Sequence, residues 1–165
     1  MSKKQKSSKT VIFNLTMPKT EIPFTRLSTP LKRFGKLRED FEAAVIAALP
    51  DVVLNGEPGN RLPNTSNLYF PGVDGEGLLI LLDEAGVSCS PGSACSTGAV
   101  QPSRIVRAMG HSAARARSSV RFSLSRFTSA EEIASAAVSV VKAVGKLRVV
   151  MPSGGGRVVG PSPSR

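Results

Sequence analysis

The sequence predicts an α/β domain in which helices pack on a short mixed sheet. Helical and extended patterns alternate along its middle, as expected for a sheet with covering helices. Its 165 residues suit a single domain, and its 41% hydrophobic content is ordinary for a soluble protein. We expect the domain to span residues 31–148. A basic disordered tail at 1–30 would precede it, and a disordered Gly/Pro/Ser-rich tail at 149–165 would follow.

The first half of the domain begins with a helix and two short strands. Apolar residues from Leu37 onward recur at helical spacing until Pro50 stops the run. Val52–Leu54 and Ser66–Phe70 are each short, apolar and bounded by turn-forming residues. We therefore predict one helix followed by two strands.

A second helix is predicted over residues 75–85. Asp74 is a suitable N-cap and Gly86 a suitable C-terminal stop. The apolar run Leu78 to Leu82 would equally suit a buried strand by periodicity alone. The length of the segment and its caps favour the helix.

In the second half of the domain, the sequence predicts two strands and two further helices. Val87–Cys89 is a short strand candidate, and Ser103 can cap a short helix through Met109. Ser119–Phe127 alternates apolar and polar residues, which indicates a half-buried strand. Ser129 and Glu132 form a capping box. The long helix that it opens has the apolar face Ile133, Ala136, Ala137, Val140, Val141 and Val144.

The net charge of +10 is concentrated at one end of the chain. Residues 1–38 carry ten Lys/Arg and one acid, giving +9, whereas residues 39–165 carry twelve and eleven, giving +1. This distribution favours a solvated basic tail. A tail that binds nucleic acid is the alternative, although it lacks interleaved aromatic residues for base stacking.

Two cysteines and no membrane-spanning apolar run place the chain in a reducing cytoplasm. The apolar stretch at residues 11–15 is too short and broken for a signal-peptide core. Two cysteines also do not make a disulfide framework. No His, Cys, Asp and Glu spacing matches a structural zinc site.

Both cysteines lie in a segment of small and turn-forming residues, from Ser88 to Ala99. Pro91, Gly92 and Gly98 argue against a helix or a central strand there. The neighbours of Cys95 are mostly hydroxyl residues and glycine, which indicates an exposed thiol on a mobile loop. An ordinary Ser/Gly loop that happens to contain cysteine is the alternative, because reactivity depends on surroundings that the sequence hides.

Several motifs in a fixed order resemble the C-terminal part of NifS/IscS-type cysteine desulfurases of the class V aminotransferase family. The resemblance covers residues 37–148. Its motifs are Arg61-Leu62-Pro63-Asn64-Thr65-Ser66-Asn67-Leu68-Tyr69-Phe70, Gly92-Ser93-Ala94-Cys95-Ser96, and Ser118-Ser119-Val120-Arg121-Phe122-Ser123-Leu124-Ser125-Arg126-Phe127-Thr128. It implies the small C-terminal domain of a fold-type I enzyme that uses pyridoxal 5'-phosphate (PLP).

The resemblance implies a role for Cys95 and for Arg121. Cys95 occupies the family's persulfide position, where a thiolate accepts sulfur from L-cysteine. Arg121 occupies the position that holds the substrate carboxylate, for which a guanidinium fork is suited. A surface salt-bridge arginine is the alternative for Arg121. For Cys89 we favour structural filler over a redox partner of Cys95.

The resemblance also implies residues that this sequence does not show. A PLP enzyme holds its cofactor on a lysine, which in this family follows a histidine. None of the lysines here follows a histidine. We therefore do not expect this chain alone to bind PLP.

The sequence thus predicts a truncated cysteine desulfurase. The family reaction converts L-cysteine to L-alanine and passes sulfur to a cysteine persulfide for iron-sulfur cluster or thio-cofactor assembly. The implied partners are a sulfur acceptor or iron-sulfur scaffold protein, a second copy as in the homodimeric family, and a companion chain with the PLP domain. The alternatives are a non-enzymatic persulfide carrier and an inactive fragment with a basic nucleic-acid-associated tail.

Overall fold

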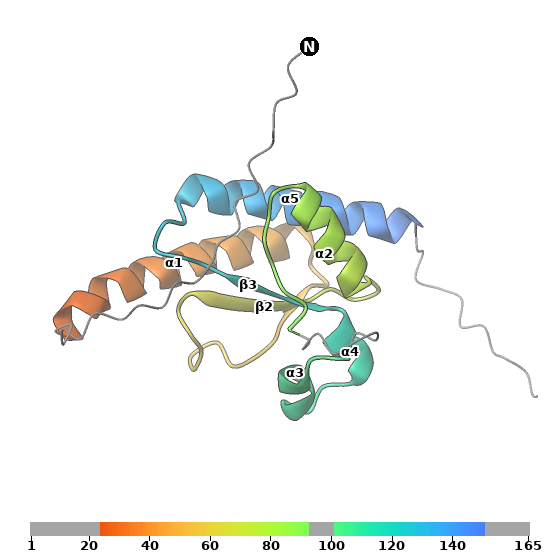
Figure 1. The fold of residues 1–165 in the computed structure, drawn as a ribbon, viewed down its shortest axis with the longest axis horizontal. Coiled ribbons are helices and arrows are strands. Elements are labelled where there is room, and N and C mark those ends of the chain that lie inside the picture. The colour runs from red at the N-terminus through yellow and green to blue at the C-terminus, as the bar shows by residue number, and fades with distance from the viewer. Residues whose placement is uncertain (1–23, 93–100, 151–165) are drawn as a thin grey trace, which may run out of the picture.

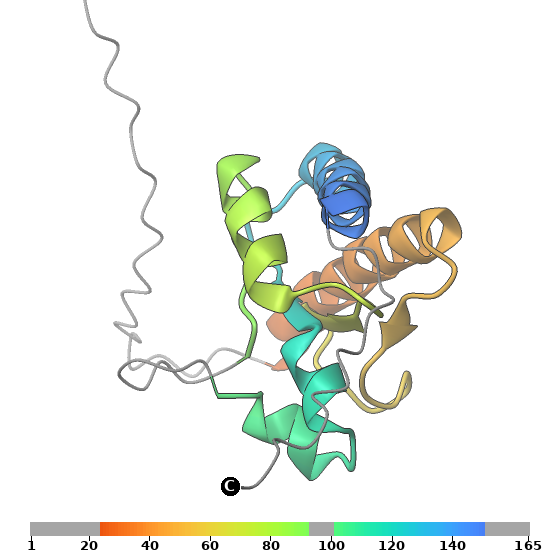
Figure 2. The same cartoon turned by 90° about the vertical axis from the view of Figure 1, so that its right-hand side faces the viewer.

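The computed structural model describes residues 24–92 and 101–150. Five helices and three strands follow one another within these residues, and a sheet lies at the centre with helices on either side (Figures 1 and 2). The helices are α1 (Phe24–Ala48), α2 (Gly75–Glu84), α3 (Arg104–Ala108), α4 (Ala113–Arg117) and α5 (Ala130–Val150). The α/β prediction is confirmed.

The sheet has the order β1-β2-β3, with β1 at Val53–Leu54, β2 at Thr65–Tyr69 and β3 at Ser119–Ser123. Both pairings within the described residues are antiparallel, where we expected a mixed sheet. Asn67 on β2 lies opposite Arg121 on β3. Since side chains alternate along a strand, these two residues share one face of the sheet.

The other face of the sheet carries the hydrophobic core, which α1, α2 and α5 cover. Leu68 and Val120 are fully buried on this face. The rings of Phe41 and Phe122 meet with centroids 4.9 Å apart, which joins α1 to β3. Figure 1 shows α1 and α5 along this side, whereas α3 and α4 lie on the opposite side near the start of β3.

The predicted helix caps are present. Asp74 accepts a hydrogen bond from the Gly77 amide at 2.8 Å. The capping box is complete, because Glu132 accepts from the Ser129 amide at 2.9 Å and the Ser129 hydroxyl accepts from the Glu132 amide at 3.1 Å. Within α2, Leu78 and Leu82 are buried at i and i+4, so the prediction of a helix is confirmed and the alternative of a buried strand is not.

Two predicted boundaries differ from the structure. Helix α1 begins at Phe24, so its first turns lie inside the stretch 1–30 that we predicted to be disordered. Strand β3 ends at Ser123 rather than Phe127. A turn competes with the strand there: the Thr128 hydroxyl accepts from the Ser125 amide at 3.0 Å, and the Ser125 hydroxyl accepts from the Phe127 amide at 3.1 Å.

Two further differences lie beside the sheet. Residues 87–89 form no strand; one isolated bridge joins Ser90 to Arg121 instead. Helix α4 was not predicted, although Ser112 caps it by accepting from the Arg115 amide at 3.1 Å. A helix of five residues is too short to show an amphipathic period, so only its cap marked it in the sequence.

Candidate functional site

Arg121 lies in the middle of β3 on the face that points away from α1 and α5. Its side chain is exposed, as the alternation of its strand predicted. It takes part in none of the ion pairs formed within residues 31–92 and 101–150. A guanidinium with no carboxylate beside it, in a strand that holds its backbone rigid, is suited to bind an anion.

The segment that leads to Cys95 is fastened to this arginine. Ser90 and Arg121 exchange two backbone hydrogen bonds, from the Ser90 amide at 3.0 Å and from the Arg121 amide at 2.7 Å. The Ser90 hydroxyl then accepts from the Gly92 amide at 3.1 Å. Gly92 turns the chain with φ of +68°, a conformation that favours glycine.

A polar network lies beside Arg121 on the same face. Buried Asn55 donates from Nδ2 to Asn67 Oδ1 at 2.7 Å and to the Ser119 hydroxyl at 2.8 Å. Arg115 on α4 donates from Nε to Asn55 Oδ1 at 2.8 Å, and its guanidinium lies 5.1 Å from the centre of the Tyr69 ring. The network fixes α4 against one end of the sheet.

Cys95, the predicted nucleophile, lies outside the described residues. Cys89 is described and has a different environment from the exposed one that we expect for Cys95. It is half-buried against the hydrophobic core. Burial and then the charge of Asp83 raise the pKa of the Cys89 thiol to about 11. This thiol is therefore protonated at neutral pH, which supports a structural role for Cys89.

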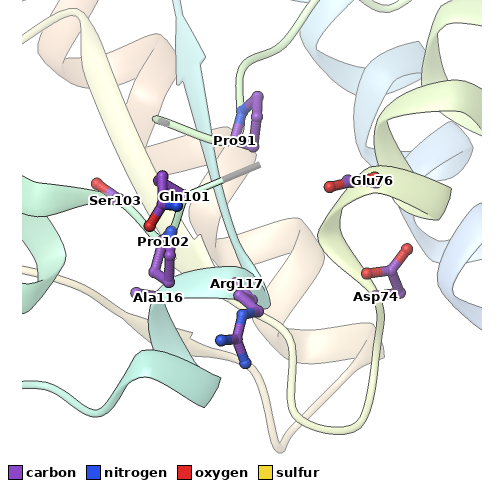
Figure 3. Close-up of a pocket in the computed structure, with 8 residues that line it drawn as sticks. All are labelled: Asp74, Glu76, Pro91, Gln101, Pro102, Ser103, Ala116 and Arg117. Carbon is purple, nitrogen blue, oxygen red and sulfur yellow. The ribbon is translucent and has the colours of Figure 1, made fainter. Parts of the chain in front are cut away.

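A small cavity lies between the start of α2, the end of α4 and the chain that precedes α3, and Figure 3 shows its lining. Its volume of about 30 Å³ suits a single water rather than a substrate. It is bounded by Asp74, Glu76, Pro91, Gln101, Pro102, Ser103, Ala116 and Arg117. Beside it, a Cβ at Gly75 would clash with the Arg117 carbonyl oxygen, so the start of α2 packs directly on the backbone before β3.

The described residues do not fit the role of a PLP-binding site. The lysines among them are Lys32, Lys36, Lys142 and Lys146. All four are exposed on α1 and α5, which cover the face of the sheet opposite Arg121. Within the same residues no group of His, Cys, Asp and Glu can hold a metal ion, and no helix is long and apolar enough to cross a membrane.

Sequence reasoning found Arg121 but missed the residues around it. Asn67 lies in the motif between Arg61 and Phe70, and the period-two alternation of β2 places it on the outer face. This alternation could have identified Asn67 from the sequence. The contributions of Asn55, Ser90 and Arg115 could not be predicted, because they depend on pairing between distant segments.

The described residues form a helix-covered antiparallel sheet with Arg121 on its open face and Ser90 paired to it. The model of the family described as aminotransferase class-V matches residues 32–135. The chain therefore belongs to the aminotransferase class-V family. Within that family, its relatives and its fold are of the NifS/IscS type.

Cysteine desulfurases are among the relatives of this chain. It is 43% identical over 136 residues to a cysteine desulfurase of Azotobacter chroococcum mcd 1, an alignment that covers 81% of this chain and 34% of the relative. It is 44% identical over 127 residues to the cysteine desulfurase NifS of Azotobacter vinelandii, covering 76% of this chain and 32% of the relative. The chain thus spans about a third of the length of these curated relatives.

Solved structures show the same fold. A structure described as a NifS-like protein superposes with a TM-score of 0.63 at 23% identity, covering 74% of this chain and 30% of that one. A NifS-like protein from Rickettsia africae ESF-5 gives 0.60 at 24% identity, covering 73% and 31%. The small-domain fold of a NifS-like enzyme is therefore confirmed.

Proposed function

We propose that this chain forms the carboxylate-binding and sulfur-accepting part of a cysteine desulfurase. The family reaction converts L-cysteine to L-alanine and leaves the sulfur as a cysteine persulfide. One observation supports the proposal: paired hydrogen bonds hold Ser90, five residues before Cys95, beside Arg121. Binding of the substrate carboxylate and acceptance of its sulfur would then take place at neighbouring points of one sheet.

Arg121 is the proposed ligand of the substrate carboxylate. It is exposed on a rigid strand, and no ion pair within the described residues occupies it. Its planar group can give two parallel hydrogen bonds to one carboxylate. Among the described residues the site is an open surface, so a working site needs a further segment or partner to exclude water from this face.

Cys95 is the proposed sulfur acceptor. It follows Gly92 by three residues. Because an extended chain spans at most about 3.6 Å per residue, its Cα lies no more than about 11 Å from that of Gly92. Cys89, whose pKa is raised to about 11, is a poor nucleophile at neutral pH.

The sulfur transfer that Cys95 can perform is a thiol–persulfide exchange. The Cys95 thiolate attacks the outer sulfur of a donor persulfide, R–S–SH. A new S–S bond forms at Cys95, the donor S–S bond breaks, and the donor leaves as the thiolate R–S⁻. The product is a persulfide on Cys95, from which an acceptor protein would take the sulfur.

PLP supplies the electron sink for the family reaction, but the described lysines do not fit the role of its anchor. We derive no step of this chain through the cofactor. We propose that a companion polypeptide segment contributes it, that a second copy and an iron-sulfur scaffold or other sulfur acceptor are the partners, and that the protein works in the cytoplasm. The position of the lysines favours a second candidate function as well, a persulfide carrier charged by another enzyme.

The test supplies purified chain with a small-molecule persulfide at neutral pH and maps the added sulfur by mass spectrometry. We expect one extra sulfur on Cys95, which Cys95→Ser abolishes. Cys89→Ser is the matched control, since it removes the other thiol of the chain, and it should leave labelling unchanged. Labelling that persists in Cys95→Ser, or that disappears only in Cys89→Ser, would overturn the proposal.

A further inference from the structure

We propose that Asn67 supplies a second hydrogen-bond donor to the carboxylate that Arg121 binds, and that buried Asn55 sets the orientation of Asn67. The inference rests on the proposed function, because it concerns the same carboxylate. It is carried by the direction of the hydrogen bonds behind Asn67. They decide which end of the Asn67 amide faces outward.

The network begins at a group that can only donate. A guanidinium has no acceptor, so Arg115 Nε, 2.8 Å from Asn55, requires the carbonyl oxygen Oδ1 of Asn55. The amide nitrogen Nδ2 of Asn55 must then point to the other side. Asn55 is 5% exposed, so its amide has little freedom to turn toward water instead.

The two protons of Asn55 Nδ2 are both used. One goes to the Ser119 hydroxyl at 2.8 Å. That hydroxyl donates its own proton to the Arg115 carbonyl at 2.7 Å, so it can only accept from Asn55. The second proton goes to Asn67 at 2.7 Å, which must present its oxygen Oδ1.

The Nδ2 group of Asn67 is therefore turned away from Asn55. The side chain is half-exposed, and no described residue accepts a hydrogen bond from this nitrogen. Asn67 lies directly opposite Arg121, so their Cβ atoms are about 5 Å apart on one face. Two donors with no acceptor between them favour an anion, and the two oxygens of a carboxylate match them.

Because the hydrogen bonds run from Arg115 through Asn55 to Asn67, Asn55 is a positioning residue for the Asn67 amide. It does not reach the open face, because its side chain is buried and its three hydrogen-bond partners are Arg115, Ser119 and Asn67. An aspartate at position 55 could only accept hydrogen bonds. It would draw the Asn67 amide nitrogen inward and leave an oxygen facing the ligand.

The test uses nuclear magnetic resonance on the ¹⁵N-labelled full chain. L-Alanine is the probe, because it carries the carboxylate without a reactive thiol, and L-alaninamide is the control ligand. We expect L-alanine to shift the side-chain signals of Arg121 Nε and Asn67 Nδ2. L-Alaninamide, which lacks the carboxylate, should leave both unchanged.

Variants distinguish the loss of the Asn67 hydrogen-bond donor from a loss of folding. Asn67→Ala should weaken L-alanine binding about tenfold, the usual effect of one hydrogen bond to a charged group. Asn67→Asp keeps the acceptor for Asn55 while removing the donor, so it should weaken binding at least as much in a chain that remains folded. Asn55→Asp should have the effect of Asn67→Ala. Ser123→Ala, on the same face of β3, is the matched control and should bind as the wild type does.

Each outcome decides one point. If the wild type binds L-alanine, Arg121→Ala abolishes binding, and both Asn67 variants bind normally, the role of Asn67 is refuted and the proposed function stands. If L-alanine and L-alaninamide shift the wild type equally, or neither shifts it, the carboxylate site fails and the inference fails with it. Normal binding by Asn55→Asp alone would refute the positioning role.

Discussion

On β3, successive side chains enter two different environments. Val120 and Phe122 are buried beneath the helices, whereas Arg121 and Ser123 between and after them are exposed on the open face. The covered face is apolar, and the open face carries an arginine, amides and hydroxyls. Stability and the proposed carboxylate binding therefore depend on alternate residues of one strand, so we expect substitutions to change one with little effect on the other.

The largest expected effect lies on the covered face. Phe122→Ala should lower the free energy of unfolding by about 3–5 kcal/mol, because it removes a buried ring that packs on Phe41 and leaves a cavity. Urea unfolding followed by circular dichroism measures the change. Its neighbour Ser123, exposed on the other face, is the control, and Ser123→Ala should stay within about 0.5 kcal/mol. Equal losses in the two variants would contradict the division between the faces.

A smaller loss of stability is expected at Ser119, where α4 covers the face of the sheet that carries Arg121. Ser119 points to that side but is fully buried beneath α4, where it accepts from Asn55 and donates to the Arg115 carbonyl. Ser119→Ala should cost about 1–3 kcal/mol, because it leaves the buried Asn55 amide and the part-buried Arg115 carbonyl with one partner fewer. The same unfolding measurement tests this. A neutral result would mean that water replaces the hydroxyl.

The smallest effect concerns Cys89, beside the sheet edge. Its folded pKa of about 11 exceeds the ordinary value of 9.0, so the folded state holds the thiol proton more tightly than the unfolded state. This contribution to stability is present below pH 9 and is lost as pH rises from 9 to 11. Wild type should therefore lose more stability than Cys89→Ala over this interval. Parallel profiles for the two proteins would show that the thiol does not titrate with folding.

The sequence contained most of the elements and part of the site. Local signals, such as the Asp74 cap and the Ser129–Glu132 capping box, act within one turn and were sufficient to place α2 and α5. The position of Arg121 on the outer face followed from alternation. Asn55 gave no such signal, because its three partners come from segments on β2, α4 and β3. Long-range pairing creates that environment, and no local pattern encodes it.

Strand β3 is hydrogen-bonded to β2, although the two strands are separated in the sequence by residues 70–118, which form α2, α3 and α4. Pairing strands that are distant in sequence requires closing a long loop, which slows folding relative to local contacts. Arg121 takes its place opposite Asn67 only when this loop has closed. The proposed carboxylate site is therefore expected to assemble late in folding, after the helices have formed, so its appearance would report completion of the native fold.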